Sequence, residues 1–365
     1  MGFDLSSLTS FLKTSVATPS KDDAVIGIDI GSSTIKIVQL KNAKGVPTVE
    51  TYGELQLGPY EGVDIGRATH LPSNKLTEAL IDILREAGAK GKLVAFALSY
   101  NSSFSTIISI PSLDQKKIGA IVPVEARKYI PISLTKVTLD WMPLEVSKED
   151  KVTNVLITAI YNEAYSRYES IMLGGSLETV ASEIETFSSI RSLVSPQDEC
   201  VAIIDWGASS TRLYIIEKGV ARKTHSVLMS GSELTGILEK ELKIEFKDAE
   251  ELKRSVGLRG KEEDPRIEKA IARSLERGLR ELHTVVVRYE ETGGAPVQKV
   301  IMSGGGALLQ GVMPYVSDMF SKPVVVADPF QKVAYPAFLE DTLKEAGPPF
   351  AVAVGIALRA FQTIQ

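Results

Sequence analysis

Two short stretches of this chain repeat one pattern, and that repetition is the strongest constraint on its fold. Residues 25–40 read VIGIDIGSSTIKIVQL and residues 203–216 read IIDWGASSTRLYII. In both stretches an apolar run ends near an aspartate, a short segment of glycine and hydroxyl residues follows, and a second apolar run then begins. The matched pairs are Asp29 with Asp205, Gly31 with Gly207, Ser33 with Ser209, Thr34 with Ser210, and Lys36 with Arg212. So many matched positions indicate a duplicated structural unit.

Each copy is predicted to form a β-hairpin whose turn can hold phosphate, because β-branched runs flank a short turn signal. Glycine lets backbone N–H groups face an anion, hydroxyl groups add donors, and an aspartate at the end of the incoming strand can hold Mg²⁺ through its waters. An ordinary Gly-Ser turn would explain either copy alone. The duplication, with the aspartate kept in both copies, favours two similar lobes that grip one phosphate chain from opposite sides.

A third glycine-rich element follows the two hairpins. Residues 300–311, VIMSGGGALLQG, run from a short apolar strand through Gly304, Gly305 and Gly306 into a helical pattern. Glycines let the backbone pass close to a ligand, and a following helix N-terminus favours negative charge. Any strand-to-helix turn can be glycine-rich, so this element alone is weak evidence for a ligand site. Its position after the two hairpins makes it strong evidence.

Composition excludes several other classes of protein. A chain of 365 residues is long enough for two lobes, and 41 Lys and Arg against 46 Asp and Glu give no sign of a nucleic-acid partner. The single cysteine, Cys200, cannot form an internal disulfide, which fits the cytosol. No apolar stretch approaches the ~18 residues of a membrane span, and the N-terminus lacks the basic start and apolar core of a signal peptide.

The three elements together resemble the actin-like ATPase superfamily, which includes actin, heat-shock chaperones, sugar kinases and the bacterial division protein FtsA. The resemblance implies an α/β fold of two lobes related by pseudo-duplication, with ATP and Mg²⁺ between them. The implied phosphate and adenosine contacts are Asp29, Gly31, Ser32, Ser33, Thr34 and Lys36; Asp205, Gly207, Ser209 and Ser210; and Gly304, Gly305 and Gly306. Asp29 and Asp205 would hold Mg²⁺ through water. Ala208 stands where the first copy has Ser32, so the second turn has one hydroxyl fewer.

Two further site predictions follow from the resemblance. The stretch DAEELKRSVG, residues 248–257, is predicted to be a helix with Asp248 as its N-cap. It could be a plain surface helix, but the family places a Glu-x-x-Lys pair against ribose and adenine, here Glu250 and Lys253. The family also puts Glu185 near the water that attacks the γ-phosphate, with Glu183 as its neighbour. The alternative is two exposed carboxylates at a helix start, and we expect slow hydrolysis at most.

Between the hairpins, residues 106–190 alternate strand and helix signals and predict a small α/β insert. Its pattern closely resembles that of the PilM family of type IV pilus assembly. The resemblance is carried by Ile110-Pro111, Tyr129-Ile130-Pro131, Leu139-Asp140-Trp141, EIETFSSIRSL at 183–193 and AVAVGIALR at 351–359. Relatives commonly carry a basic residue within the stretch that here reads FSTIISIP, residues 104–111, so the surface of the insert can differ.

The expected organisation follows from these motifs. Residues 1–23 would form a tail, 24–199 a first lobe with the insert, and 200–347 a second lobe with a helical subdomain at about 232–295; residues 348–365 would form a helix that returns to the first lobe. In the tail, apolar residues recur at roughly helical spacing and predict a short amphipathic helix. Because Lys13 is its only basic residue before position 20, packing on the protein itself or disorder is favoured over membrane binding.

The resemblance implies a cytoplasmic ATP-binding adaptor that is peripheral at the inner face of the cytoplasmic membrane. Its implied partners are the N-terminal tail of a PilN-like membrane protein, which would dock in a groove formed with the insert, other components of the pilus platform and motor, and further copies of the chain. Two alternatives stay open. An FtsA-like filament protein usually ends in a membrane-targeting helix, whereas this chain stops at Gln365. A small-molecule kinase should have a catalytic aspartate and a sugar-binding domain, and we find neither.

Overall fold

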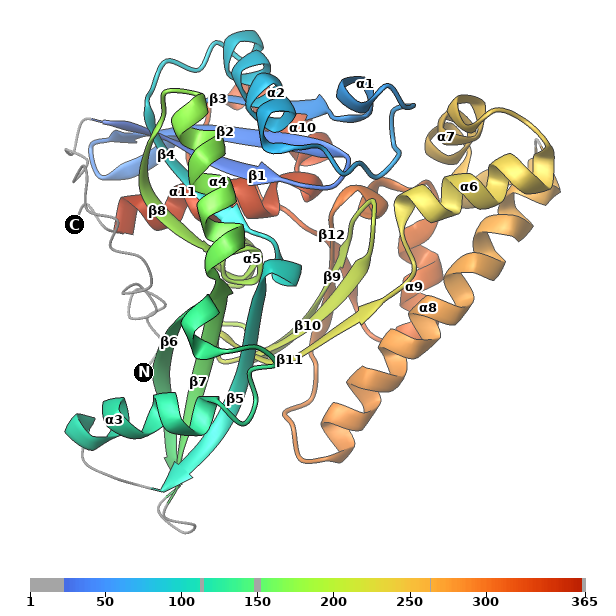
Figure 1. Cartoon of the computed structure of the whole chain (residues 1–365). Helices are drawn as coiled ribbons and strands as arrows, with labels where there is room; N and C mark the ends of the chain where they lie inside the picture. The colour runs from blue at the N-terminus through green and yellow to red at the C-terminus, as the bar shows by residue number, and fades with distance from the viewer. Residues whose placement is uncertain (1–22, 112–114, 148–151, 263, 363–365) are drawn as a thin grey trace.

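Three β-sheets organise the computed structural model of the chain, which describes residues 23–111, 115–147, 152–262 and 264–362 (Figure 1). Two of them have five strands, in the orders β3-β2-β1-β4-β8 and β11-β10-β9-β12-β13. The third has three strands in the order β5-β7-β6. The predicted amphipathic segment at residues 1–16 lies outside the described residues.

The first sheet is the core of lobe I. Its strands are β1 (Ala24–Ile30), β2 (Thr34–Ala43), β3 (Val46–Gln56), β4 (Leu93–Leu98) and β8 (Glu178–Ile184). The first three strands form an antiparallel meander, and β4 runs parallel to both β1 and β8. The helices of this lobe are α1 (Gly58–Glu61), α2 (Ser73–Glu86), α4 (Asn162–Gly174), α5 (Glu185–Leu193), α10 (Glu340–Ala346) and α11 (Ala351–Gln362). Helices α2 and α4 lie on one face and α11 on the other (Figure 1).

Lobe II repeats this arrangement. Its strands are β9 (Cys200–Trp206), β10 (Thr211–Glu217), β11 (Val220–Val227), β12 (Lys299–Ser303) and β13 (Val324–Val326). Again three strands form an antiparallel meander, and the next two run parallel to its first strand. The helices are α6 (Gly231–Leu242), α7 (Phe246–Ser255), the long α8 (Pro265–Glu291) and α9 (Val312–Phe320). The matching topology confirms the predicted actin-like fold of two related lobes.

The three-stranded sheet projects from lobe I as a small insert (Figure 1). It consists of β5 (Ser103–Pro111), β6 (Val137–Ser147) and β7 (Val152–Tyr161), with α3 (Gln115–Ala126) packed on it through Ile118 and Val122. The insert predicted at about 106–190 is longer than this unit. Residues 162–190 form α4, β8 and part of α5, and β8 hydrogen-bonds to β4 of the first sheet. The apolar residues of β8 are largely buried, so they need the lobe I sheet as their core.

The chain returns to lobe I before the expected boundary at residue 348, because Phe330 and Leu343 already pack with Val38 of the first sheet. The last helix, α11, then ties the end of the chain to lobe I. It packs against β1 so closely that a Cβ atom at Gly27 would lie 2.2 Å from the Ala353 carbonyl oxygen. Its neighbour α5 is buried along nearly its whole length. Among the helices of the described residues, none combines the length and the apolarity that crossing a bilayer requires.

Candidate functional site

The two predicted hairpins have the same backbone geometry. The Gly31 amide donates to the Thr34 carbonyl at 2.9 Å, and the Gly207 amide donates to the Ser210 carbonyl at 3.0 Å. Across each strand pair an aspartate stands opposite a basic residue: Asp29 opposite Lys36 in lobe I, and Asp205 opposite Arg212 in lobe II. The repeat found in the sequence is therefore a repeat of structure, position by position.

The carbonyl groups of both turns are held by protein donors. The bonds are Thr69 N to Ser32 O at 2.8 Å, Leu57 N to Ser33 O at 2.8 Å, Gly231 N to Gly207 O at 3.0 Å and Ser232 N to Ala208 O at 3.0 Å. All peptide bonds among the described residues are trans, so the N–H of each unit points opposite to its C=O. The amides of Ser33, Thr34, Ala208 and Ser209 therefore point away from these donors, which is the orientation needed to face an anion.

Asp29 and Asp205 lie in one electrostatic environment although they belong to different lobes. Burial raises the pKa of Asp29 to about 6, Lys36 opposes that shift, and the charge of Asp205 adds to it. Burial also raises the pKa of Asp205, against the opposing charges of Arg212 and Lys36. Two partly buried carboxylates whose charges repel are poised to accept a divalent cation, because its charge would offset both desolvation and repulsion.

Lys36 lies beneath the first turn rather than in solvent. Its side chain is 8% exposed, and its Nζ donates to the Thr34 hydroxyl at 2.5 Å. This hydroxyl is one of the predicted phosphate contacts. Lys36 therefore holds the Thr34 side chain and places a positive charge behind the turn.

The glycine-rich turn is adjacent to the second hairpin. Gly304 has a φ of +77°, and a Cβ atom there would lie 2.8 Å from the Asp205 carboxylate oxygen; a Cβ at Gly306 would lie 2.0 Å from the Trp206 ring. Gly305 faces open space. One prediction was wrong here: no α-helix begins at the glycines, because residues 305–308 form a 3-10 turn and α9 begins only at Val312.

The predicted Glu-x-x-Lys pair lies on α7, and its two members bind each other. Glu250 is 6% exposed, and its carboxylate accepts hydrogen bonds from Lys253 at 2.6 Å and from the Thr235 hydroxyl at 2.5 Å. Lys253 also donates to the Gly231 carbonyl at 3.0 Å. Because the Gly231 amide donates to Gly207, a chain of contacts connects this pair to the second turn.

The predicted N-cap of α7 was wrong. The helix begins at Phe246 with Glu245 at the N-cap position, so Asp248 lies in the first turn. Phe246 is buried, and the helix begins three residues earlier than the predicted N-cap implies. An acidic residue in the first turn still favours the helix through its dipole.

A segment of lobe I crosses to α6 and α7 of lobe II, which no sequence motif indicated. Gly66, with φ of +91°, packs so tightly that a Cβ there would lie 2.5 Å from the Glu250 carboxyl carbon. The Arg67 guanidinium lies 3.7 Å from the Phe246 ring centroid and 3.3 Å from the Glu239 carboxylate. The next residues, 68 and 69, contact Ser232 of α6 and Ser32 of the first turn, so the segment connects the first turn to lobe II.

Glu183 and Glu185 are both largely buried, so the alternative of two exposed carboxylates was wrong. Glu183 pairs with Arg191, whose Nη2 lies 2.9 Å from its Oε2. Glu185, at the start of α5, accepts from Arg212 of lobe II at 2.7 Å. Burial raises the pKa of Glu185 to about 7; Arg212 opposes this shift, while Asp205 and Asp29 add to it. Of the two carboxylates, only Glu185 belongs to the interlobe cluster.

Arg212 is the site residue that the sequence prediction left out. It was aligned with Lys36, which was assigned to the site, but its long side chain reaches the other lobe. The structure adds Arg212 to the cluster that contains Asp29, Asp205 and Glu185. The alignment was the signal that could have identified it.

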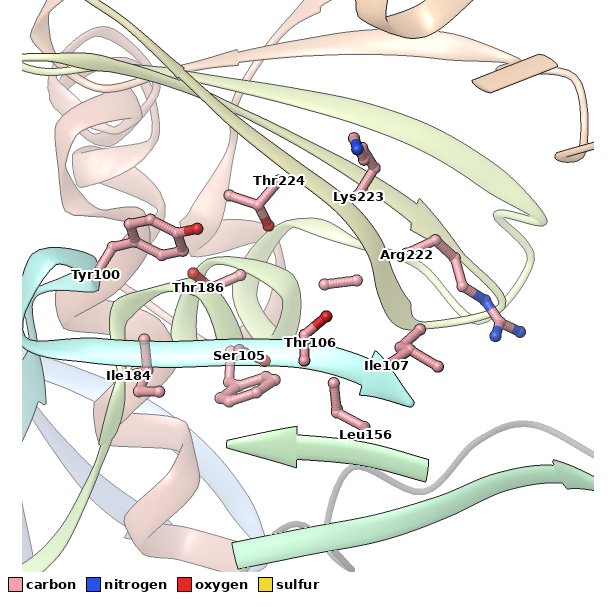
Figure 2. Close-up of a pocket in the computed structure, with 12 residues that line it drawn as sticks. Tyr100, Ser105, Thr106, Ile107, Leu156, Ile184, Thr186, Arg222, Lys223 and Thr224 are labelled. Atoms are coloured by element: carbon pink, nitrogen blue, oxygen red, sulfur yellow. The ribbon is translucent and has the colours of Figure 1, made fainter. Parts of the chain in front are cut away.

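Beside this cluster lies a cavity of about 190 Å³ between β5 of the insert and β11 of lobe II, here called the β5–β11 groove. Both strands are at the edge of their sheets. Figure 2 shows Tyr100, Thr186 and Thr224 gathered at one end of the groove and Ile107 and Arg222 toward the other. Hydroxyl and apolar side chains line it together with basic residues of β11.

Comparison with known proteins agrees with this geometry. The profile of the family described as Type IV pilus assembly protein PilM matches residues 27–361. Among solved structures, a PilM-PilN type IV pilus biogenesis complex is similar with a TM-score of 0.77 and 24% identity, over 93% of this chain and 98% of that chain.

Two other solved structures share the fold at lower similarity. The ethanolamine utilization protein EutJ of Carboxydothermus hydrogenoformans has a TM-score of 0.54 and 17% identity, over 96% of each chain. An MreB of Spiroplasma citri bound to AMPPNP has a TM-score of 0.51 and 12% identity, over 92% of this chain and 95% of that chain. With the family profile covering nearly the whole sequence, the chain belongs to the PilM family of type IV pilus assembly proteins and has an actin-like ATPase fold.

Proposed function

We propose that this protein is a nucleotide-binding adaptor of type IV pilus assembly, located in the cytoplasm at the inner face of the membrane. ATP with Mg²⁺ would bind between the two hairpins. The observation that carries this proposal is the pair of equivalent turns, each with oriented amides and a partly buried aspartate, whose two aspartates share one electrostatic environment. The similar MreB structure contains AMPPNP, which supports the same kind of ligand.

The β5–β11 groove is our candidate for the partner site. The similar PilM-PilN complex supports a PilN-like membrane protein as the partner, through its cytoplasmic tail. Edge strands offer unpaired backbone groups to an extended peptide, and the partly exposed Ile107 offers apolar surface for an anchor, with the buried Leu156 and Phe187 behind it. The groove lies between the insert and lobe II, so its width depends on how the lobes are arranged.

We assign the slow hydrolytic step to Glu185. A carboxylate whose pKa is raised to about 7 can accept a proton from an attacking water near neutral pH. Its ion pair with Arg212 opposes that role, because the guanidinium stabilises the carboxylate that would have to accept the proton. ATP would therefore act mainly as a structural and switching ligand.

Calorimetry tests the proposal directly. We expect the protein to bind Mg·ATP, and to bind a synthetic peptide of the cytoplasmic N-terminal tail of a PilN-like membrane protein; apolar anchors should supply most of the peptide affinity. A scrambled peptide is the control. Failure of the wild-type protein to bind Mg·ATP would contradict the nucleotide-binding proposal. Sedimentation of the protein with Mg·ATP into filaments would favour the FtsA-like alternative.

The affinity for Mg·nucleotide should depend on pH through Asp29. A cation binds the ionised carboxylate, so affinity is full above the pKa of about 6 and falls as pH drops through it. Between pH 7.5 and 5.5 the ionised fraction falls about fourfold, and affinity should fall with it. The measurement is the Kd for Mg·nucleotide as a function of pH, for the wild type and for Asp29→Asn. Protonation of the nucleotide itself affects both proteins equally, so the difference between the two curves reports on Asp29. Parallel curves for the two proteins would exclude Asp29 as the titrating group.

A further inference from the structure

We infer that Arg212 transmits the presence of phosphate in the cleft to the β5–β11 groove, by exchanging its ion pair with Glu185 for contact with the phosphate. This inference rests on the proposed function, and it names the residues that connect its two sites. Arg212 and Glu185 are positioning residues in this role, because they act through the walls of the groove.

The connection begins at one carboxylate oxygen. Glu185 Oε1 accepts from Arg212 Nη1 at 2.7 Å and from the backbone amide of Tyr100 at 2.8 Å. The Arg212 guanidinium carbon also lies 5.5 Å from the centroid of the Tyr100 ring. The side chains of the ion pair are only 10% and 13% exposed. A change in the partner of Arg212 would therefore alter two contacts of Tyr100: the hydrogen bond of its amide to this oxygen, and the contact of its ring with the guanidinium.

Both walls of the groove attach to this ion pair. On the lobe I side, the groove is lined by Tyr100 and by residues on each side of Glu185 in the sequence, namely Ile184, Thr186 and Phe187. On the lobe II side it is lined by β11, and Arg212 on β10 is the cross-strand partner of Ser226 on β11. The ion pair thus fastens one wall to the other beside the end where Tyr100, Thr186 and Thr224 gather (Figure 2).

Phosphate would compete for the same guanidinium. Arg212 stands opposite Asp205, the aspartate of the second turn, so it is next to the place proposed for the phosphate chain. Arginine forms paired hydrogen bonds with phosphate and with carboxylate alike. If Arg212 turns to phosphate, Glu185 loses the partner that compensates its buried charge, and the fastening between the walls is released. A ligand that favours one arrangement of Arg212 then shifts the balance between the conformations of the groove that go with the two arrangements.

A fluorescent label in the groove tests this coupling without knowledge of the partner. Cys200 is the only cysteine of the chain and is buried, so a Thr106→Cys variant can be labelled selectively with bimane. Tyr100 lines the same groove and is a quencher for this label. We expect saturating Mg·AMPPNP to change bimane fluorescence in the otherwise wild-type protein. Nucleotide binding is measured on the same samples by calorimetry.

Two variants and a matched control decide the outcome. Glu185→Gln removes the charge and keeps the shape, and Arg212→Gln removes the cation. Each variant removes the ion pair whose exchange would carry the signal, so each should lose most of the fluorescence change. Glu183→Gln makes the same chemical change in the neighbouring buried pair with Arg191 and should keep the response.

The possible failures are distinguishable. If Mg·AMPPNP binds with normal affinity but the label does not respond, the inference is overturned and the nucleotide site stands. The same conclusion follows if Glu185→Gln responds like the wild type. If Arg212→Gln fails to fold or to bind nucleotide, Glu185→Gln alone decides. Absence of nucleotide binding by the wild type would overturn the proposed function and this inference together.

Discussion

Replacing Asp205 by asparagine is expected to weaken the binding of Mg·nucleotide at least tenfold, and Asp29→Asn should have an effect of the same size. A tenfold loss corresponds to ~1.4 kcal/mol. Both carboxylates are partly buried, burial raises the pKa of each, and the charge of Asp205 raises the pKa of Asp29 further, so a cation between them would stabilise their ionised forms. The amide of asparagine keeps the shape and removes the charge that holds the hydrated Mg²⁺. Calorimetry with Mg·AMPPNP gives the affinities.

Without the metal, the asparagine substitutions should no longer weaken nucleotide binding. In EDTA the negative phosphates meet the two carboxylates directly, so either asparagine variant should bind metal-free nucleotide as well as the wild type or better. Asp318→Asn, on the exposed face of α9, is the matched control and should change neither affinity. Wild-type affinity for Mg·nucleotide in both cleft variants would show that the two hairpins are not the nucleotide site.

The parts of the site that sequence reasoning found are those encoded locally. In each hairpin, the strand, the aspartate at its end and the glycine of the turn lie within about ten residues. The motif also occurs twice, so each copy supports the interpretation of the other. The register of Asp29 with Lys36 and of Asp205 with Arg212 follows from that short loop. The glycines at 304–306 were found for the same reason.

The contacts between lobes could not be read from the sequence. Arg67 reaches Glu239 and Phe246 over more than 170 residues, and no local pattern distinguishes it from a surface arginine. The role of Arg212 needs the start of α5 to be next to β10, which only the assembled fold provides. The same limit explains the insert boundary, because an apolar strand such as β8 does not indicate which sheet it joins.

Replacing Gly355 by alanine is expected to lower the free energy of unfolding by about 3 kcal/mol, toward the upper end of the usual cost of overpacking. Gly355 lies on α11 where that helix crosses α5, and an added Cβ atom would lie 1.9 Å from the Ser188 carbonyl oxygen and 2.4 Å from its carbon. These are backbone atoms of a buried helix, so no side chain can rotate to make room. Urea denaturation followed by circular dichroism measures the change.

Gly236 on α6 provides the matched control, because it is also a helical glycine but an added Cβ atom there meets nothing within 4 Å. Gly236→Ala should stabilise the protein by roughly 0.5 to 1 kcal/mol, through helix propensity and the loss of freedom in the unfolded chain. The opposite signs separate a clash between α5 and α11 from a general effect of adding a methyl group. Helix α5 carries Glu185, and Arg191 of α5 donates to the Gly355 carbonyl. If Gly355→Ala left the free energy of unfolding unchanged, α11 would not hold α5 and Glu185 in place as the structure requires.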